Sequence, residues 1–307
     1  MINEKLFNPS GVVVVGGSDD VNKPGGAVLR NLLQSPFKGQ TYVVNPKADS
    51  VQGVKSCHTV EELPQVDCAI IAIAAKYCLH AVEVLAKEKG TRAFVILSAG
   101  FGEENKEGAA LERRIVEVID SVGGALIGPN CTGILTTNYN GSFTSPVPQL
   151  DPKGVDFISG SGATAIFIVD NGMRKGLKFN SVWSVGNSAQ IGVEEALEYL
   201  DESFDSERSS RIKLLYIESI NNPEKFLRHA ASLIRKGCRI AAVKSGSSEA
   251  GGRAASSHTG ALASPDIAVD ALFRKAQGRL HARHAAAYDD DAFLHYSLMS
   301  YIVSVGQ

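Results

Sequence analysis

The sequence predicts an α/β fold made of two doubly wound units, each a mostly parallel sheet with helices on both faces. Short β-branched runs alternate with helical patterns over the first 135 residues, and a second alternation begins near residue 154. Continuous apolar strands separated by helices are typical of a parallel sheet covered on both sides. The stretch 136–153 is rich in Thr, Asn, Ser, Pro and Gly, which predicts a linker between the units.

Each expected element rests on a β-branched run or on a helical pattern. In the first unit, strands are expected at 12–15, 41–44, 69–73, 93–97 and 125–127, and helices at 25–33, 77–89 and 106–121. In the second unit, strands are expected at 155–158, 181–185, 213–217 and 240–243, and helices at 163–175, 193–202, 223–236 and 265–275. Strands and helices therefore alternate as a doubly wound sheet requires.

The composition and charge of the chain limit the classes of function that it can have. The 307 residues and 44% hydrophobic content suffice for two ordinary cores. The 31 basic and 33 acidic residues nearly cancel, so no global field favours nucleic acid or an anionic membrane. The N-terminus has no apolar signal core, and the longest apolar run, 68–75, is too short to span a bilayer. Five cysteines without a CxxC pair fit a reducing compartment, so we expect a cytoplasmic protein.

Ligands of open parallel sheets gather at the carboxyl ends of the strands. Gly16-Gly17-Ser18 follows the first strand, and its missing side chains let backbone N–H groups approach a phosphate, although a plain tight turn explains the same residues. Asn45-Pro46-Lys47 follows the second strand, where a nicotinamide enzyme carries an acidic residue for the ribose. Lys47 suits a phosphorylated ribose instead, and a solvated turn lysine is the alternative.

Two later turns are candidates for the same crevice. Ser98-Ala99-Gly100 and Gly128-Pro129-Asn130-Cys131 follow the fourth and fifth strands. A reactive thiol at Cys131 is conceivable, but nothing adjacent in sequence is basic, which favours a buried packing role.

The second unit has an anion-binding pattern of its own. Ser159-Gly160-Ser161-Gly162 follows a strand and opens a helix, whose N-terminal amides favour an anion. Glu218 ends the strand 213–217, on the edge where the chain after the strand 240–243 also emerges. A carboxylate there can accept a ring N–H of a histidine and stabilise its imidazolium character.

A glycine-rich and serine-rich run, 251–261, supplies that histidine. His258 lies between small residues, and Thr259-Gly260 leads into the next expected helix. An imidazole is mostly neutral and nucleophilic near pH 7, as a phosphoryl acceptor must be. The alternative is an ordinary helix cap made by Ser256, Ser257 and Thr259, with His258 as a loop residue.

In this order, the motifs resemble the α-subunit of succinyl-CoA synthetase and, more closely, the α-part of the ADP-forming acyl-CoA synthetases. The matching stretches are Phe7-Asn8-Pro9-Ser10, Gly16-Gly17-Ser18, Asn45-Pro46-Lys47, Ser98-Ala99-Gly100-Phe101, Gly128-Pro129-Asn130-Cys131, Ser159-Gly160-Ser161-Gly162, Ser184-Val185-Gly186-Asn187, Glu218 and Ser257-His258-Thr259-Gly260. So many ordered motifs make chance an unsatisfactory explanation.

The resemblance implies a domain plan and a set of site residues. It implies a Rossmann-like CoA-binding domain at 1–135, a linker at 136–153, a flavodoxin-like CoA-ligase domain at 154–276 and an atypical tail at 277–307. His258 would be phosphorylated and Glu218 its partner, with phosphate held by Ser159, Gly160, Ser161, Gly162, Thr259 and Gly260. CoA would be held by Gly16, Gly17, Ser18, Asn45, Pro46, Lys47, Ile73, Ser98, Ala99, Gly100 and Asn130.

The sequence departs from the family in two places. The family carries an acidic residue shortly after the Gly186-Asn187 turn, where this chain has Gln190. After Ala276 the family continues with a glycine and an apolar, strand-like run, whereas this chain reads Gln277-Gly278-Arg279-Leu280-His281-Ala282-Arg283-His284 and then Asp289-Asp290-Asp291. His281 and His284 in that tail have the spacing of metal ligands on a helix, but no third ligand is evident, and no metal site is expected.

The resemblance implies an acid–thiol ligase that interconverts acyl-CoA and phosphate with acyl phosphate and CoA. No ATP-grasp module is expected in these residues, so Mg²⁺ and ADP or GDP would be bound by a partner, an ATP-grasp β-subunit. The chain is expected to form a hetero-oligomer with such a partner or a homodimer. Two alternatives stay open: a non-catalytic CoA-binding regulatory module, and an NAD-dependent dehydrogenase. Lys47 and the lack of a GxGxxG motif count against the dehydrogenase.

Overall fold

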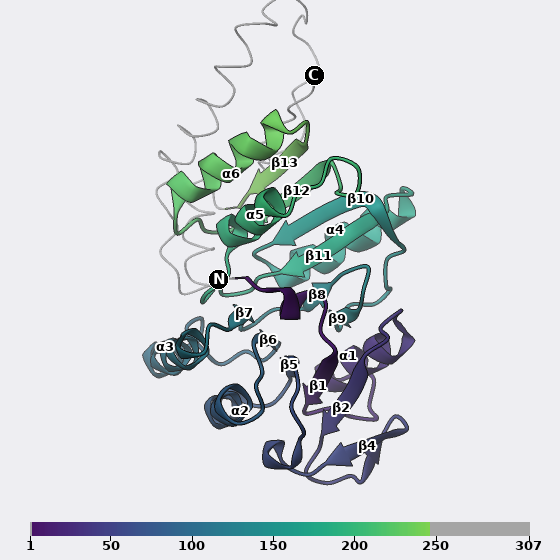
Figure 1. Cartoon of the computed structure of the whole chain (residues 1–307), viewed down its shortest axis with the longest axis vertical. Coiled ribbons are helices and arrows are strands. Elements are labelled where there is room, and N and C mark those ends of the chain that lie inside the picture. The colour runs from purple at the N-terminus through teal and green to yellow at the C-terminus, as the bar shows by residue number, and fades with distance from the viewer. Residues whose placement is uncertain (1, 246–307) are drawn as a thin grey trace, which may run out of the picture.

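Two sheets, each flanked by helices, make up the part of the chain that the computed structural model describes, residues 2–245 (Figure 1). The first unit lies in the lower half of Figure 1 and the second in the upper half. This confirms the predicted α/β class with two parallel-dominated sheets. The expected helix at 265–275 lies outside the described residues.

The first sheet has seven strands in the order β3-β4-β2-β1-β5-β6-β7. They are β1 (Gly11–Val15), β2 (Gln40–Val44), β3 (Ser50–Val51), β4 (Val54–Cys57), β5 (Cys68–Ile71), β6 (Ala93–Ile96) and β7 (Ala125–Ile127). All neighbours pair in parallel except β3 and β4, an antiparallel hairpin that the sequence pattern did not predict.

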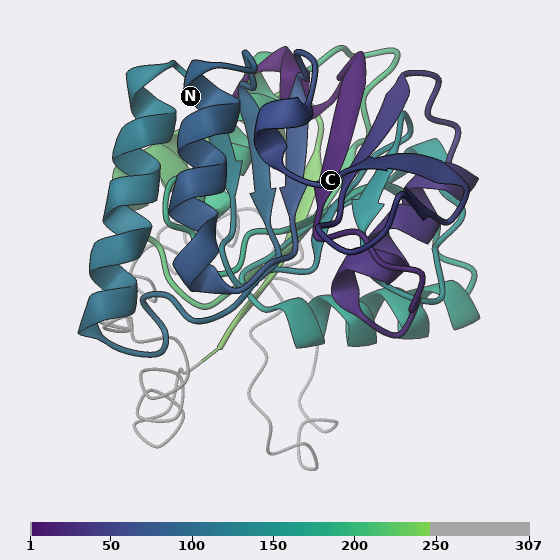
Figure 2. The ribbon, with the colours of Figure 1, turned by 90° about the horizontal axis from the view of Figure 1, so that it is seen from below.

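Three α-helices cover this sheet: α1 (Pro24–Gln34), α2 (Ala75–Lys87) and α3 (Lys106–Ser121). Short 3-10 helices occupy η1 (Glu4–Leu6) and η2 (Val60–Glu62). Alternate β1 residues point to opposite faces, so Val12 and Val14 pack with α1 while Val13 and Val15 pack with α2 and α3. Figure 2 shows α2 and α3 side by side.

The second sheet has six strands in the order β13-β12-β10-β11-β8-β9. They are β8 (Gly133–Leu135), β9 (Asn140–Ser142), β10 (Leu150–Ser159), β11 (Phe179–Ser184), β12 (Ile212–Ile217) and β13 (Arg239–Lys244), with helices α4 (Gly162–Arg174), α5 (Val193–Glu202) and α6 (Pro223–Arg235). The four strands β10 to β13 are parallel, as predicted.

The stretch expected as a linker, 136–153, contains β9 and the start of β10, and so contributes strands to the second sheet. β9 pairs antiparallel with β8, which precedes this stretch and lies within the residues assigned to the first domain, and β8 pairs antiparallel with β11. The polar residues that suggested a loop make internal hydrogen bonds instead: Ser142 Oγ donates to the Thr132 carbonyl at 2.8 Å. Asn31 of α1 donates to the carbonyls of Ser142 and Thr144 at 2.8 and 2.9 Å. The hairpin therefore connects the two units closely.

One apolar core runs through both units. The buried cluster around Val12 and Val14 of β1 continues to Ile158 of β10 and Trp183 of β11. The N-terminal segment contributes Phe7, whose ring stacks on Tyr199 with centroids 4.2 Å apart. Burial of such apolar surface stabilises by about 25 cal/mol per Å², so this shared core stabilises the contact between the two units. None of the helices within residues 2–245 is long and apolar enough to cross a bilayer.

Candidate functional site

Each sheet has a topological switch point, a strand from which the connections lead to neighbours on opposite sides. In the first sheet β1 lies between β2 and β5, and in the second β10 lies between β11 and β12. Ligands of open α/β sheets bind outside the carboxyl ends of the strands at such a switch point. Gly16 and Ile73 lie at the first switch point, and Gly160 and Glu218 lie at the second.

The turn after β1 has room only for glycine. Gly16 has φ +87°, and a Cβ there would lie 2.6 Å from the Ala72 carbonyl oxygen. A Cβ on Gly25, in the first turn of α1, would lie 2.1 Å from the Gly16 carbonyl oxygen. Lys23, the N-cap of α1, makes no side-chain capping hydrogen bond. The missing side chains thus bring β1, α1 and the end of β5 close together, the backbone arrangement expected of a phosphate-approaching turn.

Asn45 connects the turns that follow β1 and β2. Its Nδ2 donates to the Gly17 carbonyl at 2.8 Å, and its Oδ1 accepts from the Lys47 N–H at 2.9 Å. Lys47 and Pro46 are exposed beside this junction. Gln52, which sequence reasoning missed, donates to the Ser18 carbonyl at 2.7 Å. The predicted residues of the first two turns therefore lie next to one another.

The loop after β6 joins the same edge. Ser98 Oγ donates to the Ile73 carbonyl at 2.5 Å, which places two of the predicted CoA-binding residues in contact. Gly100 has φ +103°, and its N–H donates to Glu103 Oε1 at 2.7 Å. That N–H already has a protein partner.

A pocket of about 340 Å³ lies between the two units. Both units contribute to its lining, which consists of Leu97, Asn130, Cys131, Thr132, Phe143, Gly160, Ser161, Gly162, Ala163, Ile166, Gly186, Asn187 and Glu218. Asn130, predicted among the CoA-binding residues, thus lies with the residues predicted to bind phosphate.

The start of α4 is formed by the serines of its glycine-rich turn. Ser161 is the N-cap, and its Oγ accepts from the Thr164 N–H at 3.3 Å. Ser159 Oγ accepts from the Ser161 N–H at 3.2 Å. A Cβ on Gly160 would lie 3.4 Å from the Glu218 Cβ, so this turn and the end of β12 pack closely. A helix N-terminus beside a carboxylate can bind an anion and position a cationic or hydrogen-bonding partner.

Lys244 adds a buried cation next to Glu218. The residue is 6% exposed, and its Nζ donates to the Glu218 carbonyl at 3.1 Å and to the Ser245 carbonyl at 2.7 Å. The sequence alone does not single out this lysine, because its place inside a strand gives no signal. His258 and Thr259-Gly260 lie outside the described residues, so their pairing with this pocket stays a prediction.

Two residues singled out by the sequence have structural contacts. Cys131 is buried, its Sγ lies 3.2 Å from the Ile96 carbonyl, and burial raises the pKa of the thiol to about 12. Such a thiol is a packing group. Gln190 accepts from the Leu126 N–H at 2.6 Å and donates to Asp120 Oδ1 at 2.6 Å, so it connects the second unit to the first.

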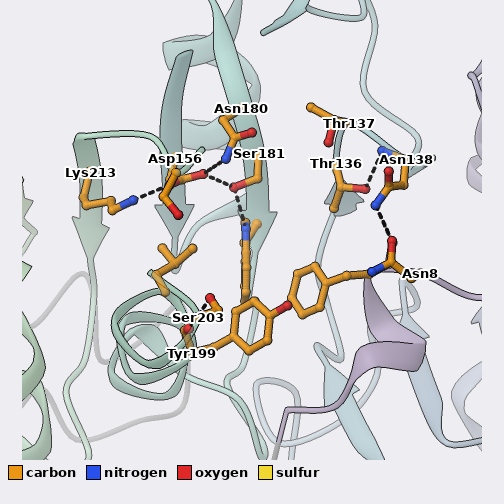
Figure 3. A pocket seen from close by; sticks show the side chains of 14 residues that line it. Asn8, Thr136, Thr137, Asn138, Asp156, Asn180, Ser181, Tyr199, Ser203 and Lys213 are labelled. Carbon is orange, nitrogen blue, oxygen red and sulfur yellow. Dashed lines mark hydrogen bonds and ion pairs between the residues drawn. The ribbon is translucent and has the colours of Figure 1, made fainter. Parts of the chain in front are cut away.

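Another pocket, of about 200 Å³, lies near the amino ends of the parallel strands of the second sheet (Figure 3). Its polar side chains contact one another: Lys213 Nζ lies 2.5 Å from Asp156 Oδ2, and Ser181 donates to Asp156 at 2.6 Å. Asn138 donates to Asn8 at 2.5 Å. Mutual pairing of this kind indicates a structural network. Within residues 2–245, no group of three His, Cys, Asp or Glu side chains is placed to hold a metal ion.

Comparison with known families and structures agrees with this arrangement. Residues 11–137 match a CoA binding domain, and residues 152–284 match a succinyl-CoA ligase like flavodoxin domain. The CoA match counts against the dehydrogenase alternative.

Known relatives cover most of the chain. ADP-forming acetate–CoA ligase I of Archaeoglobus fulgidus is 38% identical over 278 residues, which are 89% of this chain and 39% of the relative. The α subunit of ADP-forming acetate–CoA ligase II of Pyrococcus furiosus is 38% identical over 273 residues, 88% of this chain and 58% of the relative. The solved acetyl-coenzyme A synthetase 1 of Ca. Korarchaeum cryptofilum, in complex with phosphate and ADP, superposes with a TM-score of 0.80 at 32% identity, covering 89% of this chain and 57% of that one. The chain thus spans roughly two fifths to three fifths of these relatives' length.

Proposed function

The chain belongs to the family of the ADP-forming acetate–CoA ligases, and we propose that it is the α-type component of a nucleoside-diphosphate-forming acyl-CoA synthetase. The first unit binds CoA, and the pocket between the units handles phosphate and the acyl group. The enzyme is an acid–thiol ligase. The substrate is a carboxylic acid, and the relatives named for acetate make acetate the first acid to test.

The reaction starts with an attack of a phosphate oxygen on the carbonyl carbon of acyl-CoA. The C–S bond breaks, an acyl phosphate forms, and CoA leaves as a thiol after taking up a proton. A ring nitrogen of His258 then attacks the phosphorus, which breaks the P–O bond to the acyl group and releases the carboxylate. Hydrogen-bond donors held in fixed positions and in-line alignment of the reacting atoms contribute most to the rate of such a transfer, because the phosphoryl group carries its charge on its outer oxygens.

One observation carries the proposal: the glycine-rich start of α4 and Glu218 line one pocket together with Asn130 of the CoA-binding unit. This arrangement supports transfer between a thioester held by the first unit and a phosphate held by the second. Glu218 would accept the second ring N–H of His258 and stabilise the imidazolium that develops. Thr259-Gly260 would supply further phosphate contacts.

The phosphoryl group passes to ADP or GDP on a partner with an ATP-grasp fold, together with Mg²⁺, which offsets charge on the nucleotide. The name of the Pyrococcus furiosus relative as a subunit alpha supports a partner of this kind. The chain is therefore expected to reach phosphohistidine alone and to be discharged only when the partner, ADP and Mg²⁺ are added.

The first experiment is calorimetry of the chain with CoA and with NAD, followed by thiol release from acetyl-CoA. CoA should bind at micromolar concentration and NAD should not, and free thiol should appear only when inorganic phosphate is present. Binding of CoA without any thiol release or phosphohistidine would favour the non-catalytic regulatory module. Binding of NAD in place of CoA would contradict the assignment.

A further inference from the structure

We propose that Glu103 is a positioning residue that couples the loop after β6, on the CoA side, to Asn187 in the pocket between the units. The inference rests on the proposed function, because it concerns how the CoA site and the phosphate pocket communicate. Nothing in the proposed reaction uses Glu103 directly, and it is absent from the pocket lining.

The Glu103 carboxylate bridges the two units with its two oxygens. Oε1 accepts from the Gly100 N–H at 2.7 Å and from the Phe101 N–H at 3.3 Å. Oε2 accepts from Asn187 Nδ2 at 2.5 Å. One rigid, planar group therefore joins the backbone of the loop after β6 to a side chain that follows β11.

A second carboxylate completes the orientation of Asn187. Glu112 Oε2 accepts from the same Nδ2 at 2.9 Å and from the Gly102 N–H at 3.3 Å. The Asn187 amide nitrogen thus donates to both carboxylates, which uses both of its N–H bonds. The Asn187 carbonyl oxygen then faces Asn130, whose Nδ2 donates to it at 3.3 Å. Asn187 is thus held in one orientation at the pocket wall.

The two carboxylates have different electrostatic environments. Burial raises the pKa of Glu103, but the hydrogen bonds from Asn187 and Gly100 outweigh it, so the pKa lies below its ordinary value. Burial dominates at Glu112 and holds its pKa above the ordinary value, although Asn187 opposes the effect. The hydrogen bonds that Glu103 accepts therefore favour its ionised form, in which both oxygens are acceptors.

Because of these hydrogen bonds, a ligand that shifts the loop after β6 also shifts Asn187, and a ligand that shifts Asn187 also shifts this loop. The loop contains Ser98 and Gly100, which are predicted to contact CoA, while Asn187 and Asn130 line the pocket predicted to hold phosphate. Coupling between two binding sites is reciprocal, so inorganic phosphate should change the affinity for CoA as much as CoA changes the affinity for phosphate.

The test measures the CoA dissociation constant of the 307-residue chain by calorimetry, with and without saturating inorganic phosphate. In the wild-type chain, phosphate should change this constant by about fivefold or more, the lower end of ordinary coupling. In Glu103→Gln the amide would set its own N–H groups against Asn187 or Gly100, and the change should fall below about twofold. Asn187→Ala should lose the coupling too, and combining both substitutions should add nothing further.

Glu107→Gln is the matched control. It removes the same charge from an exposed side chain in the first turn of α3, and it should keep the wild-type coupling. The inference would be overturned if phosphate left the CoA dissociation constant of the wild-type chain unchanged, or if Glu103→Gln kept the full wild-type coupling. A Glu103→Gln chain that binds CoA more weakly but keeps the coupling would also overturn it, since that is a purely structural effect. A wild-type chain that binds no CoA would overturn the proposed function first.

Discussion

Lys213→Met is expected to destabilise the protein by about 3 kcal/mol, near the lower end of the 3–5 kcal/mol range for breaking a buried ion pair. Lys213 Nζ lies 2.5 Å from Asp156 Oδ2, and both side chains are 1% exposed. The substitution leaves the Asp156 carboxylate buried without its cation. The cost stays at the lower end because Asn180 and Ser181 still donate to Asp156 Oδ1 at 2.7 and 2.6 Å.

The double variant Asp156→Asn with Lys213→Met should recover about half of the loss or more, since no uncompensated charge remains. Lys178→Met is the control. Lys178 pairs with Asp151 at 3.3 Å, but its side chain is 51% exposed, so its loss should cost about 0–1 kcal/mol.

The assay is urea unfolding, with the free energy of unfolding extrapolated to water and the slope compared between variants. A Lys213→Met cost below about 1 kcal/mol would refute the reasoning, and so would a double variant no more stable than the single one.

The ion pair between Asp156 and Lys213 also bears on the candidate site. Asp156 and Lys213 are register partners on β10 and β12, the strands whose carboxyl ends carry Gly160 and Glu218. Phosphohistidine formation should therefore fall together with stability.

Three further outcomes concern the predicted CoA-binding turns and the pocket between the units. Lys47→Ala should weaken CoA binding by about 1–3 kcal/mol, the range for a hydrogen bond to a charged group, and calorimetry with unchanged affinity would remove Lys47 from the CoA site. Gly16→Ala should weaken CoA binding and lower the melting temperature, because its Cβ would lie 2.6 Å from the Ala72 carbonyl oxygen at φ +87°; wild-type values in both measurements would contradict this. Glu218→Gln should slow phosphorylation of His258 by roughly 10²-fold, about 2.7 kcal/mol in the barrier, and a wild-type rate in single-turnover kinetics would refute the pairing.

The sequence predicted the parallel strands and their helices well because buried strands are short continuous apolar runs. β1, with five buried residues in a row, is the clearest case. The hairpin of β8 and β9 was missed, since each strand has three residues and its polar groups are satisfied from far away in the sequence. Asn31, for example, donates to the Ser142 carbonyl across 111 positions.

The candidate site was predicted only in part. Turns that follow strands, such as Ser159-Gly160-Ser161-Gly162, reveal their position through glycine and serine, and the topology then brings Gly160 beside Glu218. The contacts of Asn187 with Glu103 and Glu112 span 84 and 75 positions, and no local pattern pairs residues so far apart.

Mass spectrometry of the chain after incubation with acetyl-CoA and labelled inorganic phosphate tests the central claim most directly. We expect one phosphoryl group on His258, stable to base and labile to acid, which forms only when both substrates are present. It should be absent in His258→Ala and retained in His80→Ala, a change to an exposed histidine of α2. Labelled phosphate on the His258→Ala chain, or no phosphohistidine in a wild-type chain that binds CoA, would contradict it.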